Sequence, residues 1–127
     1  MNLFDVAIVN VKGVIDYRDT KYCVCVSILK DKYLLINTEH RSMYDDFKIE
    51  AKDYPFLQNE DRFVSCSKIH TFDFRRIIKS VGNLEIKDIK KIIEKIRNSR
   101  SIHKIDKDLI LPELENWLSE NRKISDG

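Results

Sequence analysis

The sequence predicts an α+β fold in which a small barrel of short β-strands is followed by two or three helices. The first two-thirds of the 127 residues contain short runs of β-branched and apolar residues bounded by polar turns, which is the pattern of strands. After residue 71 the apolar residues recur with a helical period. Only 3 glycines and 2 prolines occur, which argues against a linker or a long disordered tail, so we expect one compact domain.

Five segments have the pattern of strands. The second and third are separated only by Lys30-Asp31-Lys32, so they should form a hairpin. The polar loop before the second strand carries Gly13 and Arg18, and the third strand ends in a polar cluster that begins at Thr38. The predicted strands span residues 6–11, 22–29, 33–38, 47–50 and 62–69. Five short strands with local connections are typical of a small barrel.

Three helices are predicted after these strands. Asp73 is placed to cap a short helix through residue 78, with Gly82 as its left-handed end. A longer helix spans Ile86 to Asn98, where isoleucines recur at i, i+3, i+6, i+7 and i+10 and lysines take the other faces. Pro112 at a first-turn position signals the last helix. The apolar side of that helix comprises Leu111, Leu114, Trp117 and Leu118.

The composition excludes several classes of protein. The longest apolar stretches, such as Tyr22 to Leu29, are far shorter than the roughly 20 residues of a membrane-spanning helix. The N-terminal residues lack the basic and apolar segments of a secretory signal, so we expect a cytoplasmic protein without membrane association. Cys23, Cys25 and Cys66 lie in strand-like runs and are expected to be buried reduced thiols. No fourth ligand occurs at a suitable spacing, so no metal site is predicted.

Charge is distributed unevenly along the chain, although the total is only +2. Residues 1–67 carry 9 basic and 11 acidic side chains, a net charge of −2. Residues 68–104 carry 11 basic and 4 acidic side chains, a net charge of +7, and residues 105–127 carry 3 and 6, a net charge of −3. The middle block is either a surface that faces a polyanion or the solvated face of a helix.

One region of the chain has a recognisable order of motifs. From Asp61 to Ile102 it combines a strand, the run Lys68-Ile69-His70-Thr71-Phe72-Asp73, the basic Arg76, the turn Val81-Gly82-Asn83-Leu84 and an amphipathic helix. This order resembles the PemK/MazF family of toxin endoribonucleases, which have a strand, a segment like Q-I-R-T-I-D, a basic residue, a turn like I-G-x-L and a final helix.

The N-terminal half resembles the same family more loosely. Phe4-Asp5-Val6 is similar to the opening G-D-I/V of the family's first strand, with Phe4 in place of glycine. The run from Tyr33 to Thr38 is similar to the strand that ends in the family's catalytic threonine. Where the family has R-P-V-L-V, with an arginine important for catalysis, this chain has Lys21-Tyr22-Cys23-Val24-Cys25-Val26.

The resemblance covers about residues 4 to 102 and implies an SH3-like barrel with helices. We therefore expect residues 1–102 to form the PemK/MazF-like unit, and residues 103–127 to form an additional helix packed on the same domain or on a partner. Family members cut single-stranded RNA by attack of the ribose 2′-hydroxyl on the adjacent phosphate, so no metal or cofactor is implied. The implied partners are single-stranded RNA, an antitoxin or other protein, and a second copy in a homodimer.

The resemblance also implies which residues form the site. Thr38 matches the catalytic threonine, and Lys21 stands in for the arginine, although an ammonium lacks the planar donor fork of a guanidinium. Arg18 in the first loop and His40 just past Thr38 are two further candidates, the latter because imidazole titrates near neutral pH. The expected RNA-binding residues are Arg41, Lys68, His70, Arg75 and Arg76.

All of this depends on one geometric expectation, namely that the polar ends of the second and third strands meet in one groove. Two other functions stay open. One is a non-catalytic module with the same barrel, such as a phage or mobile-element protein that binds a host protein or nucleic acid. The other is an RNA- or DNA-binding regulator that uses the basic block 68–104.

Overall fold

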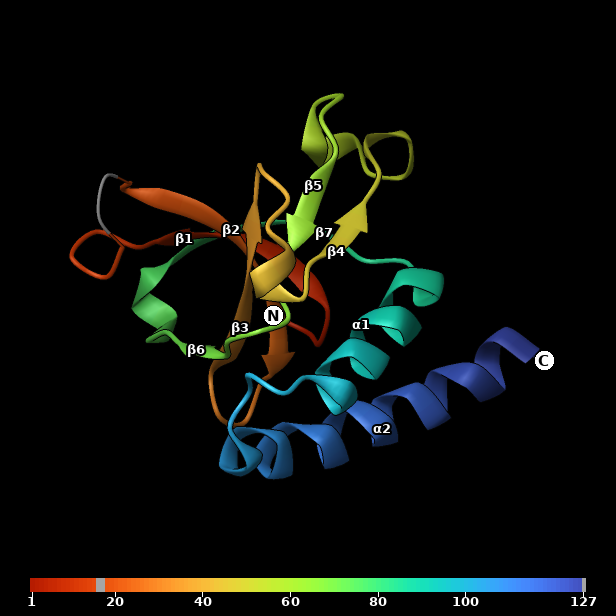
Figure 1. Cartoon of the computed structure of the whole chain (residues 1–127). Coiled ribbons are helices and arrows are strands. Elements are labelled where there is room, and N and C mark those ends of the chain that lie inside the picture. Colours follow the sequence, from red (N-terminus) through yellow and green to blue (C-terminus); the bar gives the residue numbers. More distant parts are fainter. Residues whose placement is uncertain (16–17, 127) are drawn as a thin grey trace.

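The computed structural model describes residues 1–15 and 18–126, which form one antiparallel sheet with two helices packed beside it (Figure 1). The strands are β1 (Asp5–Asn10), β2 (Thr20–Ser27), β3 (Lys32–Asn37), β4 (Phe47–Ile49), β5 (Arg62–Val64), β6 (His70–Thr71) and β7 (Ile77–Asn83). The helices are α1 (Ile86–Asn98) and α2 (Lys104–Asp126). Four 3-10 turns connect them: η1 (Ser42–Tyr44), η2 (Ala51–Asp53), η3 (Pro55–Leu57) and η4 (Phe74–Arg76).

The sheet has the strand order β4-β5-β3-β2-β1-β7, with β6 paired to β3. This confirms the α+β class and the predicted hairpin of the second and third strands. In residues 1–15 and 18–126 no ladder joins the edge strands β4 and β7, so backbone hydrogen bonds do not close a barrel. Instead, Phe56 of η3 reaches β7, where a Cβ on Gly82 would come within 2.8 Å of its ring. The same ring lies 6.0 Å from that of Tyr22 on β2.

The core explains the continuous apolar run of β2. Residues 23–27 are all buried, because one face of this strand looks into the curled sheet and the other contacts α2. The three cysteines are buried free thiols. Burial raises the pKa of each thiol to about 12, so the thiols stay protonated at neutral pH.

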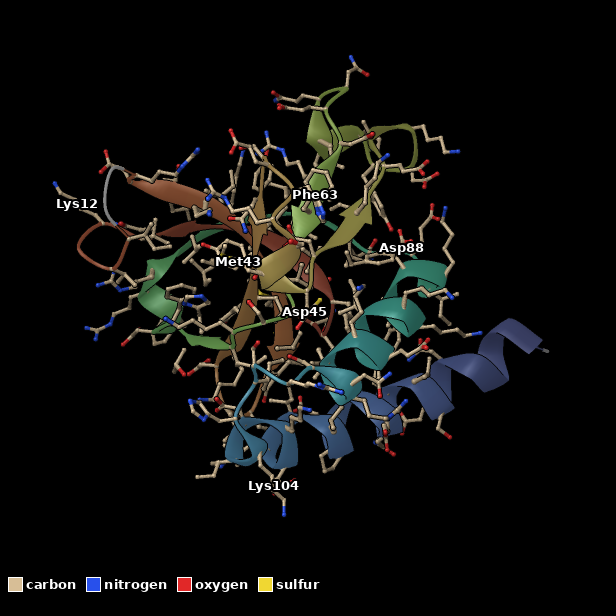
Figure 2. All side chains as sticks on the ribbon, in the orientation of Figure 1. Lys12, Met43, Asp45, Phe63, Asp88 and Lys104 are labelled. Atoms are coloured by element: carbon tan, nitrogen blue, oxygen red, sulfur yellow. The ribbon has the colours of Figure 1, made fainter. Side chains whose placement is uncertain are left out.

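Helix α1 has the bounds that its isoleucine stripe predicts. Ile89, Ile92, Ile93 and Ile96 are buried, and α1 packs on β4 and α2. Its C-terminal end is tied to the loop after η1, where Ser99 Oγ donates to Asp45 Oδ2 at 3.3 Å (Figure 2).

Two of the predicted helices differ from the structure. Asp73 does cap a turn by accepting a hydrogen bond from the Arg75 amide, but only the 3-10 turn η4 follows, and residues 77–83 form β7. A short run such as Ile77-Ile78 fits a strand as well as a helix, and Gly82 is needed for the close approach of Phe56 rather than as a helix end. The prediction of a helix at 73–78 was therefore wrong.

The last helix begins earlier than Pro112 indicates. Helix α2 starts at Lys104, so Pro112 lies inside it, where it cannot bond to the carbonyl one turn earlier. Pro112 is on the exposed side, so water can satisfy that carbonyl. The apolar side of α2 extends on both sides of the proline, since Ile110 and Leu114 are fully buried. Packing on the same domain therefore holds the helix despite the lost bond.

Phe4 has a left-handed backbone that bulky residues rarely adopt, with φ of 63°. The Phe4 amide donates a hydrogen bond to the Cys25 carbonyl at 2.8 Å, and the Phe4 carbonyl accepts one from the Leu84 amide at 3.1 Å. These two hydrogen bonds hold the backbone in this conformation. The side chain is 1% exposed and packs edge-on against Trp117 of α2, with 5.0 Å between ring centroids. This is the position at which the resemblance places a glycine, and burial of the ring offsets the backbone strain here.

Replacing Phe4 should separate these two effects. Phe4→Ala removes the buried ring and keeps the strained φ, so it should lower the free energy of unfolding by about 3–5 kcal/mol. Phe4→Gly also removes the ring but relieves the strain, so it should be more stable than Phe4→Ala by about 1 kcal/mol, the reverse of the usual order. Urea unfolding of the two variants measures the difference. A less stable Phe4→Gly variant would show that the backbone at residue 4 is unstrained.

Candidate functional site

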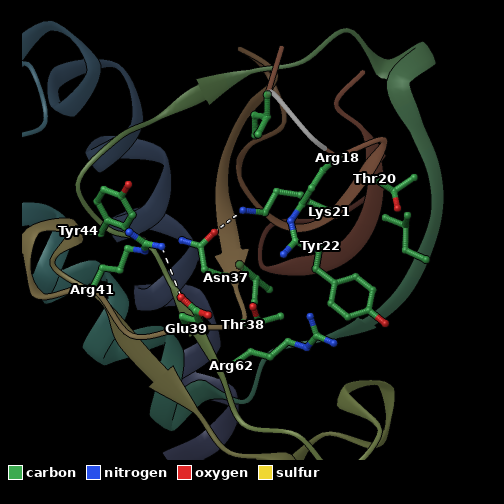
Figure 3. Close-up of a pocket in the computed structure, with 13 residues that line it drawn as sticks. Arg18, Thr20, Lys21, Tyr22, Asn37, Thr38, Glu39, Arg41, Tyr44 and Arg62 are labelled. Atoms are coloured by element: carbon green, nitrogen blue, oxygen red, sulfur yellow. Dashed lines mark hydrogen bonds and ion pairs between the residues drawn. The ribbon is translucent and has the colours of Figure 1, made fainter. Parts of the chain in front are cut away.

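A cleft of about 720 Å³ opens where β2 begins and β3 ends (Figure 3). Four of the residues predicted from the sequence line it, namely Arg18, Lys21, Thr38 and Arg41. They come from the first loop, β2 and the segment after β3. The further polar lining consists of Thr20, Tyr22, Asn37, Glu39, Tyr44 and Arg62. The expectation that the polar ends of the second and third strands meet in one groove is therefore confirmed.

The register of the hairpin brings these groups together. Tyr22 pairs with Ile36, which places Lys21 opposite Asn37 and one step from Thr38. Lys21 Nζ donates a hydrogen bond to Asn37 Oδ1. Partial burial, together with the positive charge of Arg18, lowers the pKa of Lys21 below its usual value. Lys21 thus gives up its proton more easily than a surface lysine.

The segment after β3 is held by a buried carboxylate. Asp46 has a fully buried side chain, and its Oδ2 accepts a hydrogen bond from the Arg41 amide at 2.6 Å. Arg41 and Glu39 form an exposed ion pair at 3.4 Å beside the cleft. His40 lies outside the cleft lining, with its Nδ1 3.5 Å from Asp46 Oδ2 and its ring 5.4 Å from that of Phe63. The structure therefore does not bring His40 together with Thr38 and Lys21.

Arg62, which the sequence reasoning did not select, also lines the cleft. It enters from β5, and its guanidinium carbon lies 5.0 Å from the centroid of the Tyr22 ring. Tyr22 in turn donates a hydrogen bond from its hydroxyl to the Phe56 carbonyl at 3.2 Å. A cation at the start of a short strand is usually solvated, so no local signal marked Arg62. Only the pairing of β5 with β3 brings it to this place.

The other predicted RNA-binding residues lie outside this lining. Lys68 borders a second cavity of about 420 Å³, which shares Tyr44 with the cleft. His70 sits in β6 and stacks on Phe72 at 5.7 Å, and burial, with the charges of Lys68 and Lys21, lowers its pKa to about 4. His70 is therefore neutral near pH 7 and brings no positive charge to a phosphate.

The two remaining arginines are engaged elsewhere. Arg75 forms a two-point contact with Asp73, through Nε at 3.1 Å and Nη2 at 2.9 Å. Arg76 Nη1 donates to the carbonyls of Asn10 at 3.1 Å and Lys12 at 3.3 Å. Arg76 thereby anchors the end of β1, where the loop that leads to Arg18 begins.

Within residues 1–15 and 18–126, no three His, Cys, Asp or Glu side chains lie close enough together to hold a metal ion. In the same part of the chain no helix is long and apolar enough to cross a membrane.

Comparison with known proteins gives a structural match. No protein-family model and no curated protein sequence matches the chain. Among solved structures, of which 22 chains match, is the Mycobacterium tuberculosis toxin MazF-mt6. The match has a TM-score of 0.60 and 14% sequence identity, and it covers 78% of this chain and 98% of the toxin. The chain therefore has a MazF-like fold, as the resemblance predicts, carried by a strongly diverged sequence.

Proposed function

We propose that this chain is a toxin-like endoribonuclease that cleaves single-stranded RNA without a metal ion, through attack of a 2′-hydroxyl on the adjacent phosphate. One observation carries the proposal: Arg18, Lys21, Thr38 and Arg41, which come from separate segments, line one cleft of a MazF-like fold. Among the described residues, the cleft lining holds four cationic side chains and one carboxylate, that of Glu39. Such a surface attracts the phosphodiester backbone of a nucleic acid.

The cleft offers groups for each step of this reaction. The Thr38 hydroxyl donates a hydrogen bond to a phosphate oxygen, and the cations stabilise the extra negative charge of the phosphorane. The leaving 5′-oxygen needs a proton, and Lys21 supplies it because its pKa is lowered. Glu39 is the carboxylate of the lining that accepts the proton of the 2′-hydroxyl. His40 is left out of this mechanism because it does not line the cleft.

The proposal includes an antitoxin and a homodimer. Support for a protein partner comes from large apolar side chains that the described surface exposes. Leu29 on the β2–β3 turn is 81% exposed, Met43 in η1 is 72% exposed and Ile105 at the start of α2 is 75% exposed. A non-catalytic module is the second candidate, and the feature that favours it is a lysine in place of the family's arginine at position 21.

Metal-free cleavage distinguishes the two candidates. Purified protein in excess EDTA should cut a mixed single-stranded RNA and leave 2′,3′-cyclic phosphate ends. Thr38→Ala should lower the cleavage rate by about 100-fold, because it removes a donor to the transition state. Thr38→Ser, which keeps the hydroxyl, should retain most of the activity. Absence of cleavage by the unaltered protein, freed of any antitoxin, would support the non-catalytic module.

The pH dependence of cleavage tests the role of Lys21. A group that donates its proton works while protonated, so activity should fall as pH rises through the lowered pKa of Lys21. Lys21→Arg keeps the positive charge but cannot release a proton, so the rate should drop about 100-fold or more and the alkaline decline should disappear. The rates are measured from neutral to alkaline pH, after subtraction of uncatalysed hydrolysis. If the cleavage rate and its pH profile are unchanged in Lys21→Arg, Lys21 acts only through its positive charge and not as a proton donor.

A further inference from the structure

Arg62 is a guanidinium in the cleft to which the proposed reaction assigns no role of its own. Its side chain is only 21% exposed, and its closest carboxylate oxygen, on Glu60, is 3.7 Å from Nη2. Within the described residues, the buried Nε of Arg62 has no hydrogen-bond partner. Buried polar groups of proteins are nearly always paired, and a guanidinium carries five N–H donors. The pair with Glu60 is a weak partner, because the distance is long and Glu60 itself is 60% exposed.

The guanidinium of Arg62 lies against an aromatic side chain of the same cleft. The guanidinium carbon lies 5.0 Å from the centroid of the Tyr22 ring, and the two side chains are neighbours in the cleft (Figure 3). Tyr22 is itself held by its hydroxyl, which donates to the Phe56 carbonyl, and by the edge-on contact of its ring with that of Phe56. The arginine therefore loses little further freedom on meeting a ligand.

The positive charge of the cleft favours an anionic ligand. In the part of the chain that the structure describes, Arg62 shares the lining with three other cations and with one carboxylate, and that carboxylate is already paired with Arg41. An anion with two acceptor oxygens in one plane matches the donors of a guanidinium. At about 720 Å³ the cleft is the size of a site for a drug-sized ligand, so it holds more than an isolated ion.

We propose that Arg62 binds a backbone phosphate of the RNA strand in the cleft through two parallel hydrogen bonds from its Nη groups, with Tyr22 as the residue that positions its guanidinium. This proposal rests on the proposed function, because it assumes that the cleft holds a single strand. Arg62 then supplies the planar pair of hydrogen-bond donors that the ammonium of Lys21 cannot provide. Arg62 is a substrate-binding residue here, whereas Tyr22 acts through it.

The test measures binding apart from cleavage. A fluorescent 2′-O-methyl RNA oligonucleotide of mixed sequence, which cannot be cut, is titrated with protein at several salt concentrations. Arg62→Ala should bind about 10-fold or more weakly, and its slope of log affinity against log salt should be shallower by about 0.7, the value for one phosphate contact of a single strand. Arg62→Lys should keep the slope of the unaltered protein but bind less tightly, since it retains the charge without the fork.

Tyr22 and a remote arginine supply the controls. Tyr22→Leu should weaken binding and Tyr22→Phe should restore it, because phenylalanine keeps the ring that supports the guanidinium. Arg97→Ala removes the same charge from α1, where Arg97 pairs with Glu115, and should leave the salt slope unchanged. Urea unfolding of each variant shows that it is folded.

The outcomes separate this proposal from the proposed function. Folded Arg62→Ala and Arg62→Lys could both bind the oligonucleotide with normal affinity and salt slope while RNA cleavage stays intact. That result would overturn the role of Arg62 but would leave the proposed nuclease activity unaffected. The salt slope of binding could depend on Arg62 in a protein that does not cut RNA. That result would support the role of Arg62 in strand binding and would exclude the proposed nuclease activity. No binding of the oligonucleotide by the unaltered protein would overturn the role of Arg62.

Discussion

The antiparallel register between β2 and β3 is the constraint on which the cleft depends. It places Lys21 opposite Asn37 and next to Thr38, and a slip of one residue would turn these side chains to the other face. The far end of the same hairpin is fixed by Glu113 of α2. Its carboxylate accepts hydrogen bonds from the Ser27 hydroxyl at 2.8 Å and the Ile28 amide at 3.1 Å. Helix α2 thereby holds the end of β2 that lies away from the cleft.

Helix α2 is bound to the barrel-like sheet by more than this carboxylate. Trp117 packs edge-on against the ring of Phe4. The backbone of Phe4 is hydrogen-bonded to Cys25 of β2 and to Leu84, just before the start of α1. A glycine at position 4 would adopt this backbone without strain but would leave Trp117 of α2 without the ring on which it packs. Phe4 and helix α2 are therefore best understood together, because burial of the ring against α2 replaces the conformational freedom that glycine would give the backbone.

Much of the fold and half of the site follow from local patterns. The strands at 22–29 and 33–38 are adjacent along the chain, so their pairing and the meeting of their polar ends needed no long-range information. The isoleucine stripe likewise predicted α1. Arg62 was missed because its place depends on a contact with Tyr22, forty positions away in sequence. The predictions for 73–78 and Pro112 failed because tertiary packing outweighed the local signals of a cap and a proline.

Under the proposed function, the cleft must provide both a planar pair of donors and a group that can release a proton. A single arginine can provide only the planar pair of donors, because its guanidinium stays protonated throughout the physiological pH range. Lys21, whose pKa is lowered by burial and by Arg18, meets the second requirement, and Arg62, whose guanidinium contacts the Tyr22 ring, meets the first. The lysine at position 21 is thus consistent with a division of two roles between two residues, and its presence alone does not argue that the chemistry has been lost.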